Sequence, residues 1–552
     1  MALRTGAITL PILVSAPKIA CAQTADWTGN GGSDDWSTPA NWSTSSVPSS
    51  GTVTINSDVP GSETIGVTAA NAEFSGSTLN VGAPSGNNAT LALIQGSEFT
   101  LGTVSVGTAA GSKGMLHIHG STLTATNSFQ VGSSGHGEFV ISGEGARLAI
   151  TDANRHLNVG NSSGGYGRME IRDGARVDAW NVSVGNTRGA GELIVDGPGS
   201  VLAINGRDLS AAGQTGGVYI AVLDGGAITI EGDGGAPGAR GMLQLGNNEQ
   251  TTTLLLDGAG SRITTTGNAL IGEFGIVNAQ VEKAALLEVG HDLIVGAYQD
   301  LSGPPATLAI TGQDSAVLVA GDGRGDRNRY GLGAVTLSEG GLLRSAGDVY
   351  IVRDVIDDSH ARGALNFGAA AGEAPARAGM LEAAAIRFGS SQGRLVFNHD
   401  ADATTGPYLF TQDLVGAGTI EHHAGLTRVT SENNGSFTGT TMLRGGTMWI
   451  DGTLGGAMDV RHDGNLHGSG TVGPTVNAGT IAPGGDRLGR LTHQFETLTI
   501  HGDYRGENGA LLIHADLGGD GSPADRLVVK GGTSGDTTVS VVNLGGEGAP
   551  TT

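Results

Sequence analysis

The chain has 552 residues, 97 of them glycine, with 4% aromatic and 15% charged residues. Its formal net charge of −23 argues against nucleic acid and anionic lipid surfaces as partners, because both are bound through basic patches. A compact globule of this length would usually divide into several domains, whereas a solenoid need not, because each of its coils contacts only its neighbours.

The first segment, residues 1–22, has the features of a signal peptide. A basic start and an apolar run over residues 8–16 precede small residues at 20–22, which is the pattern of a cleavage site. The only cysteine, Cys21, lies in this leader, so the mature chain is expected to contain no thiol. A lipoprotein in which Cys21 is acylated is the alternative. No other stretch reaches the ~18 consecutive apolar residues of a membrane helix.

Residues 23–50 hold three of the five tryptophans, Trp27, Trp36 and Trp42. One interpretation is an aromatic platform for sugar rings. The other, which we favour, is an N-terminal cap, because the first coil of a solenoid exposes its core and has to be covered.

Residues 51–352 repeat one sequence pattern about every 25 residues. Such a period is typical of solenoids, propellers and arrays. A short alternating strand ends in glycine, a turn follows, and a second alternating strand comes next. The strand-ending glycines are Gly107, Gly132, Gly160, Gly185, Gly246, Gly272 and Gly296.

The residue pattern of each repeat indicates strands. Apolar residues alternate in residues 137–142, 167–172 and 191–196, which is strand periodicity. The breaks combine glycine with Asp, Glu, Pro or Ser, which is turn chemistry. A propeller blade would need ~40–45 residues, so one coil of a parallel β-helix fits the period better. The predicted fold class is all-β, a single-stranded parallel β-helix, or β-solenoid.

The rest of the chain divides into three segments, which differ in their residue pattern. Residues 353–413 break the period, and we expect irregular coils or a loop there. Residues 414–494 resume short strand repeats with different wording, as in Gly416 to Ile420. Residues 495–552 have a third, distinct residue pattern and are predicted to form a C-terminal cap or junction.

The second half also resembles a known family. Residues 433–441, 466–472 and 479–485 are similar to the passenger of a type V autotransporter, and residues 498–543 resemble the pertactin-like junction that precedes its translocator. The resemblance implies a right-handed β-helix, exported to the outer membrane, the cell surface or the medium. It also implies an outer-membrane translocator barrel as a partner, which we expect to be absent from this chain. A host-cell receptor or glycan is a further possible partner.

The resemblance and the lack of catalytic motifs favour a non-enzymatic, adhesin-like or structural rod with no cofactor. Serine-protease members carry Gly-Asp-Ser-Gly, whereas this chain has the shifted sequence 519–523 and no recognisable partners for a triad. Pectin-cleaving β-helices carry paired carboxylates and a Gly-His-Gly sequence. Here His136 and the pair Asp357 and Asp358 occur in reverse order. A polysaccharide-acting lyase or glycosidase on the same scaffold is the alternative function, with residues 353–400 as the place to look.

Two histidine pairs are candidate metal ligands. His117 and His119 alternate on one strand and therefore point the same way. No third ligand is evident, so we predict a surface pair and no metal site. His422 and His423 are adjacent, so on a strand their rings face opposite sides.

One tripeptide is a candidate binding motif. Arg324, Gly325 and Asp326 lie in a polar, glycine-rich stretch that follows a strand. The functional interpretation is integrin-type binding, as some pertactin-like adhesins carry such a tripeptide in a loop. The alternative is chance, since Gly, Asp and Arg co-occur readily in a glycine-rich segment.

Overall fold

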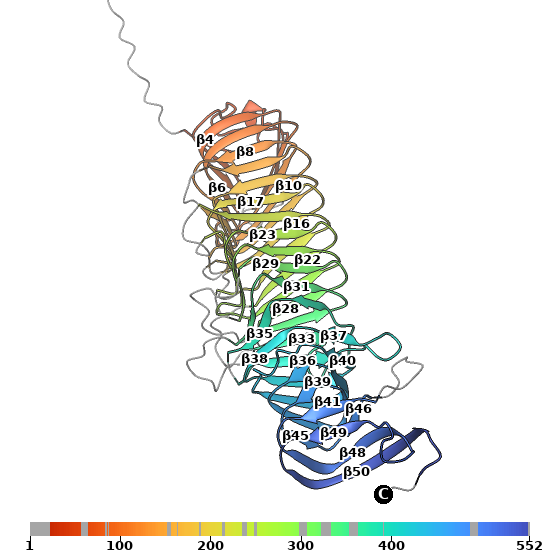
Figure 1. Ribbon diagram of the computed structural model, residues 1–552. Helices are drawn as coiled ribbons and strands as arrows, with labels where there is room; N and C mark the ends of the chain where they lie inside the picture. Colours follow the sequence, from red (N-terminus) through yellow and green to blue (C-terminus); the bar gives the residue numbers. More distant parts are fainter. Residues whose placement is uncertain are drawn as a thin grey trace, which may run out of the picture.

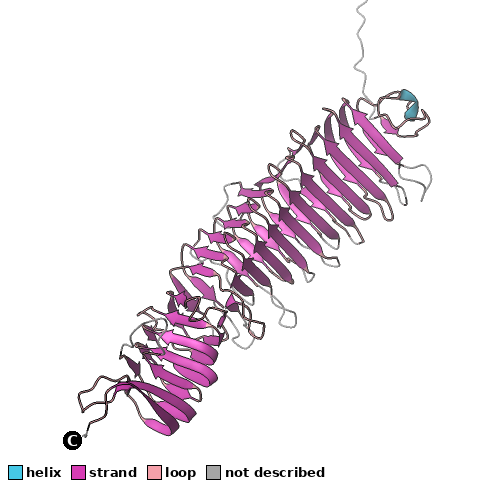
Figure 2. Ribbon diagram, turned by 90° about the vertical axis from the view of Figure 1, so that its right-hand side faces the viewer, coloured by secondary structure: helices cyan, strands magenta, loops and turns pink. Residues whose placement is uncertain are grey.

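The described part of the chain is a rod of stacked β-coils, about 17 in number (Figures 1 and 2). At about 4.8 Å between neighbouring strands, this stack is about 80 Å long. No α-helix occurs among the described residues; a 3₁₀ turn, η1 (Pro39–Asn41), lies near the start. The computed structural model describes residues 23–56, 65–82, 86, 88–151, 156–162, 164–186, 189–211, 216–233, 240–247, 251–296, 306–321, 333–352, 363–389, 391–485 and 495–549.

Each regular coil places strands on three faces, and every strand pairs in parallel with its equivalent in the next coil. Short parallel crossovers of this kind make the helix right-handed. The first face contains β3 (Ile65–Ala70), β5 (Asn88–Ile94), β7 (Lys113–His119), β10 (His136–Ser142), β13 (Tyr166–Arg172), β16 (Ala190–Asp196), β19 (Val218–Leu223), β22 (Thr252–Asp257), β25 (Val277–Glu282), β28 (Thr307–Thr311), β30 (Ala334–Ser338), β33 (Ala364–Gly368), β36 (Arg394–Asn398) and β39 (Thr419–Ala424).

The second and third faces follow along the chain from each first-face strand. The second contains β8 (Thr122–Ala125), β11 (Arg147–Ile150), β14 (Arg176–Ala179), β17 (Val201–Gly206), β20 (Ala227–Gly232), β23 (Arg262–Thr265), β26 (Leu286–Val289), β29 (Ala316–Val319), β31 (Leu342–Ser345) and β34 (Met380–Glu382). The third contains β1 (Thr24–Asp26), β2 (Thr52–Ile55), β9 (Phe129–Val131), β12 (His156–Val159), β15 (Asn181–Val184), β18 (Leu209–Ala211), β21 (Leu243–Leu245), β24 (Ala269–Ile271) and β27 (Leu293–Val295). The longer strands β4 (Glu73–Val81) and β6 (Glu98–Val106) pair on both faces.

The C-terminal third continues the stack with longer strands. Its elements are β32 (Val349–Ile351), β35 (Ala385–Phe388), β37 (Tyr408–Phe410), β38 (Asp413–Gly416), β40 (Leu426–Val429), β41 (Thr440–Ile450), β42 (Thr453–Leu454), β43 (Ala457–Gly468), β44 (Thr471–Val472), β45 (Thr475–Asn477), β46 (Thr480–Pro483), β47 (Thr497–Ile500), β48 (Tyr504–Asp516), β49 (Arg526–Val529) and β50 (Thr533–Gly545). In the segment 353–413, expected to be irregular, the described residues form β33 to β37 and the start of β38, which all pair in parallel with strands of neighbouring coils. Its extra length lies in the connections, such as residues 369–379.

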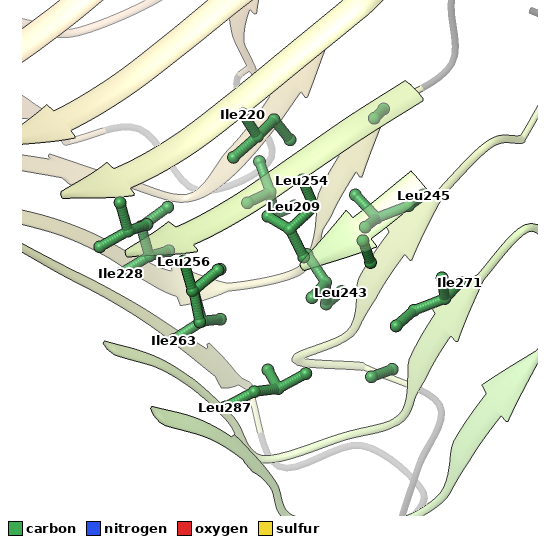
Figure 3. Close-up of a cluster of buried hydrophobic side chains, with 14 of the residues drawn as sticks. Leu209, Ile220, Ile228, Leu243, Leu245, Leu254, Leu256, Ile263, Ile271 and Leu287 are labelled. Atoms are coloured by element: carbon green, nitrogen blue, oxygen red, sulfur yellow. The ribbon is translucent and has the colours of Figure 1, made fainter. Parts of the chain in front are cut away.

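Alternation along each strand builds the core. In β13 the burial pattern changes at every residue, so that Met169 and Ile171 point inward and are fully buried. In-register pairing stacks Met169 between Phe139 and Leu193 of the neighbouring coils. Figure 3 shows the same continuous packing two coils further on. It comprises Leu209, Ile220, Ile228, Leu243, Leu245, Leu254, Leu256, Ile263, Ile271 and Leu287. Each such side chain contributes about 1.5–3 kcal/mol by its burial.

The repeated glycine is required where a coil turns closely over the next one. Gly132 has a φ of +64°, and a Cβ built there would lie 1.8 Å from the carbonyl oxygen of Tyr166. Gly160 is equivalent, with a φ of +70° and 1.8 Å from a Cβ to the Ala190 oxygen. Only a residue without a side chain adopts this backbone at so close an approach.

The N-terminal tryptophans are buried over the first coils, each 2% exposed. Trp42 meets Trp27 and Trp36 edge to face at centroid distances of 5.0 and 4.6 Å, and its indole donates to the Trp36 carbonyl. Trp36 also packs on Phe99. Rings buried in this way are not available as a platform for sugars.

Candidate binding surfaces

The outer side of the first face carries a charged ladder, defined as Glu138, Arg168, Glu170, Arg172 and Glu192 on β10, β13 and β16. Register places Arg168 between the two glutamates of the neighbouring strands. Its guanidinium lies 3.0 Å from Glu138, 2.6 Å from Glu170 and 3.5 Å from Glu192. Half-exposed ion pairs contribute little stability, about 0–1 kcal/mol each. The ladder is therefore better suited to presenting a fixed pattern of charge than to holding the fold.

An aromatic pair borders this ladder. The ring of His136 stacks on Tyr166 at a centroid distance of 4.8 Å and an angle of 25°. Burial, with a hydrogen bond to Glu192, raises the pKa of the Tyr166 phenol, which therefore stays neutral. His136, the central residue of the Gly-His-Gly sequence, is thus an exposed residue of the regular outer surface of the first face.

The pair His117 and His119 lies on the outer side of β7, next to the same ladder. The hydroxyl of Ser142, on β10, contacts Nε2 of His117 at 3.0 Å and Nδ1 of His119 at 3.1 Å. Burial lowers the pKa of His117, and the nearby Arg172 adds to this effect. Within the described ranges, no three His, Cys, Asp or Glu side chains are grouped so that they could hold a metal ion.

The second histidine pair lies on β39, and its rings point to opposite sides. His423 faces outward and contacts the Glu421 carboxylate at 2.9 Å. His422 faces inward and is fully buried. Its Nδ1 lies 2.8 Å from the Gly445 carbonyl oxygen, and its Nε2 lies 3.0 Å from the Thr427 hydroxyl.

A further histidine, which the sequence analysis did not find, completes this cluster. His399 is fully buried, and its Nε2 lies 2.8 Å from the same Thr427 hydroxyl. Burial lowers the pKa of His399 to about 4 and that of His422 to about 3. Both rings are therefore neutral at physiological pH. No motif marked His399, because its partner is 28 residues away on the next coil.

A groove lies beside His399 at the corner of these coils, with a volume of about 570 Å³. Two exposed carboxylates, Asp400 and Asp402, line it together with His467 and the apolar side chains of Pro375 and Leu426. Three backbone and hydroxyl donors of residues 404–405 hold Asp402 in its own turn and lower its pKa.

The other candidates from the sequence do not form a catalytic arrangement in the described residues. Ser522 lies in the turn between β48 and β49, where its amide donates to the Gly519 carbonyl. A buried pair, His514 and Asp525, spans the same turn at 3.0 Å and was not predicted. The carboxylates of 357–358 lie outside the described residues.

The tripeptide Arg324-Gly325-Asp326 also lies outside the described residues. It falls between β29, which ends at Val319, and β30, which begins at Ala334. Its role as a binding motif stays a prediction.

No helix in the described ranges has the length and apolar character needed to cross a membrane.

Comparison with known proteins adds a family match at the C-terminal end. Residues 477–552 match the family Autochaperone Domain Type 1. This range includes β48, β49 and β50, the last strands of the stack.

Similar proteins align with between 10% and 47% of the chain. The Adhesin BmaC autotransporter of Brucella suis is 30% identical over 266 residues, which are 47% of this chain and 6% of that protein. The Probable autotransporter YfaL of Escherichia coli is 31% identical over 143 residues, 25% of this chain and 11% of that one. The Uncharacterized protein YdeU of the same species is 54% identical over 54 residues, 10% of this chain and 12% of that one. The chain thus spans only about a tenth or less of the length of these relatives.

Proposed function

This chain is an autotransporter passenger, exported to the outer membrane or the medium, and from that premise we propose that it acts as a non-enzymatic, adhesin-like rod. The single observation that carries the proposal is the charged ladder on a continuous face of stacked coils. A rigid rod of this kind offers repeated weak contacts, whose combined avidity exceeds any one of them. One of the relatives is named as an adhesin, which supports the same role.

The ladder suits a binding surface because its groups are fixed and only partly buried. Arg168 is held by three glutamates, and its side chain is 28% exposed. Fixed charges lose little side-chain entropy on contact with a partner. The neighbouring Tyr166 and His136 add a stacked aromatic surface of the kind that is enriched in recognition sites.

The proposal includes two partners. One is an outer-membrane translocator, through which an autotransporter passenger is exported. The other is a host-cell receptor or glycan. If the tripeptide takes part, then changing Asp326→Glu should abolish attachment to host cells while leaving the fold intact.

Attachment of passenger-coated beads to cultured host cells tests the function. We expect the purified chain to mediate attachment, and Arg168→Gln to reduce it, because the ladder loses the cation that bridges glutamates on three neighbouring strands. Arg461→Gln is the matched control, since Arg461 is also exposed but pairs with Asp459 alone in the described residues. Absence of attachment by the folded wild-type rod would contradict the proposal, as would equal attachment of the two variants.

The alternative, a polysaccharide-acting enzyme, is tested separately. Incubation of the passenger with a panel of polysaccharides should release no new reducing ends or unsaturated products. Release of either would favour the enzyme.

A further inference from the structure

The hydrogen bonds around His422 fix the position of every proton in the buried histidine cluster. The Gly445 carbonyl oxygen can only accept, so the Nδ1 of His422 carries the proton that it receives. The Nε2 of His422 is then an acceptor, and the Thr427 hydroxyl donates to it. The hydroxyl oxygen in turn accepts from Nε2–H of His399. Since His399 is neutral, its Nδ1 carries no proton and presents a lone pair.

This lone pair has no partner among the described residues. His399 is fully buried, and its Nδ1 makes no hydrogen bond there. The neighbouring backbone is Gly425, at which a Cβ would lie 2.2 Å from this nitrogen. Both residues line the groove beside β36 and β39. A buried acceptor without a donor is costly, and such groups in native proteins usually have a partner. In the bound state inferred below, the Gly425 backbone moves aside, because it lies against this nitrogen.

The other groups in the groove define the chemistry of a ligand. The carboxylates of Asp400 and Asp402 are acceptors, as is the lone pair of His399, and no Lys or Arg is among the described lining residues. These acceptors favour a ligand that brings donors and carries no negative charge, and Thr447 and His467 in the same lining add further polar contacts. The walls add apolar surface from Pro375 and Leu426. The volume of about 570 Å³ is within the usual range of small-molecule sites.

We propose that this groove is a saccharide subsite, which binds a neutral or amino sugar ring through a hydroxyl donated to Nδ1 of His399. Hydroxyl or ammonium groups at the other end of the ring face Asp400 and Asp402, and the apolar face of the ring lies on Leu426. The inference rests on the proposed surface-binding function, to which it adds a class of ligand. It places a discrete pocket at the C-terminal third of the rod, well separated from the charged ladder.

Binding of three monosaccharides to the full chain tests the proposal. Glucosamine, glucose and glucuronate are titrated by calorimetry and followed by saturation-transfer NMR, with a dissociation constant of about 1 mM expected for a single ring. We expect glucosamine to bind at least as well as glucose, because its ammonium faces two carboxylates. Glucuronate should not bind, because its charge has the sign of the groove.

Variants separate this site from the rest of the surface. In His399→Gln the amide still donates to Thr427 but the acceptor at the Nδ1 position is lost, so affinity should fall about tenfold or more at unchanged melting temperature. His462→Gln is the matched control, because His462 is an exposed ring on β43, outside the groove. Asp400→Asn, a change at an exposed side chain, should weaken glucosamine more than glucose.

Three results would overturn the inference: no binding of glucose or glucosamine to the folded wild type, equal affinity of His399→Gln and wild type, or preference for glucuronate. Attachment of the beads to cells without sugar binding would leave the proposed function standing and refute this subsite alone. Sugar binding without attachment would support this subsite and refute the proposed function.

Discussion

Acid should loosen the coils that hold the buried histidines before it affects the rest of the rod. The pKa of His399 is lowered to about 4 and that of His422 to about 3, whereas an unfolded histidine titrates near 6.5. Between these values the unfolded chain binds protons that the folded chain does not. Stability is therefore full above about pH 6.5 and falls as the pH falls toward about 4.

Between about pH 4 and pH 6.5, the size of this loss of stability depends on how far the pH lies below the pKa of the unfolded histidine. At pH 5 the pH is about 1.5 units below the pKa of an unfolded histidine. Each buried neutral ring therefore lowers the free energy of unfolding by about 2 kcal/mol. The two rings together lower the free energy of opening of this segment by about 4 kcal/mol relative to pH 7. Asp400, beside His399, acts in the opposite direction but is exposed, and its effect is screened by solvent.

Native-state hydrogen exchange, read by mass spectrometry, measures this locally. Amides of β36 and β39 should lose protection between pH 7 and pH 5 after correction for the intrinsic rate, while those of β13 should change less. The double variant His399→Gln and His422→Gln should lose this pH dependence, and His462→Gln should keep it. Equal pH slopes in the wild type and the double variant would refute the reasoning, as would greater protection at pH 5.

Three other perturbations test the fold. Gly132→Ala should lower the free energy of unfolding by more than about 1 kcal/mol, measured by urea denaturation, because its methyl would meet the Tyr166 carbonyl in a left-handed backbone; unchanged stability would contradict the close approach. Leu254→Ala should cost about 2–5 kcal/mol in the same experiment, because it removes a fully buried side chain from the stack, and a cost typical of a surface change would show that the core is loosely packed. Deleting residues 495–543, which contain most of the autochaperone match, should reduce the yield of protease-resistant rod on refolding far more than deleting two central coils, residues 131–184; equal losses would show that the end of the rod has no special role in folding.

The stack could be predicted from the sequence because its rules are local. Alternation gives the strands, and glycine at positions such as Gly132 gives the corner where two coils approach. Alternation recurs in every regular coil and the corner glycine in most of them, so the period identifies the β-helix. The same rules could not place residues 353–413, where connections of unequal length hide the register. They were expected to be irregular, yet strands such as β33 and β36 pair as regularly as those before them.

The candidate binding groups were harder to predict because they depend on contacts between coils. Strand alternation predicted that the rings of His422 and His423 face opposite sides. It did not indicate which ring is buried, and the link from His422 to His399 through Thr427 depends on the register of two coils with different connections. The ladder around Arg168 is likewise assembled from three coils. Each of its residues looks like ordinary surface charge when the sequence is read along one strand. The tripeptide at 324–326 could be recognised as a motif, but its role stays a prediction.

The most direct test of the central claim, that the rod binds without performing chemistry, is one experiment on the folded passenger and a panel of polysaccharides. Retention of the protein on each immobilised polysaccharide is measured, and the size distribution of the same soluble polysaccharide is read after incubation with the protein. We predict retention on at least one neutral or amino-sugar polymer with no change in polymer length. Shortening of any polymer, or no retention on the panel and no attachment to host cells, would contradict the account.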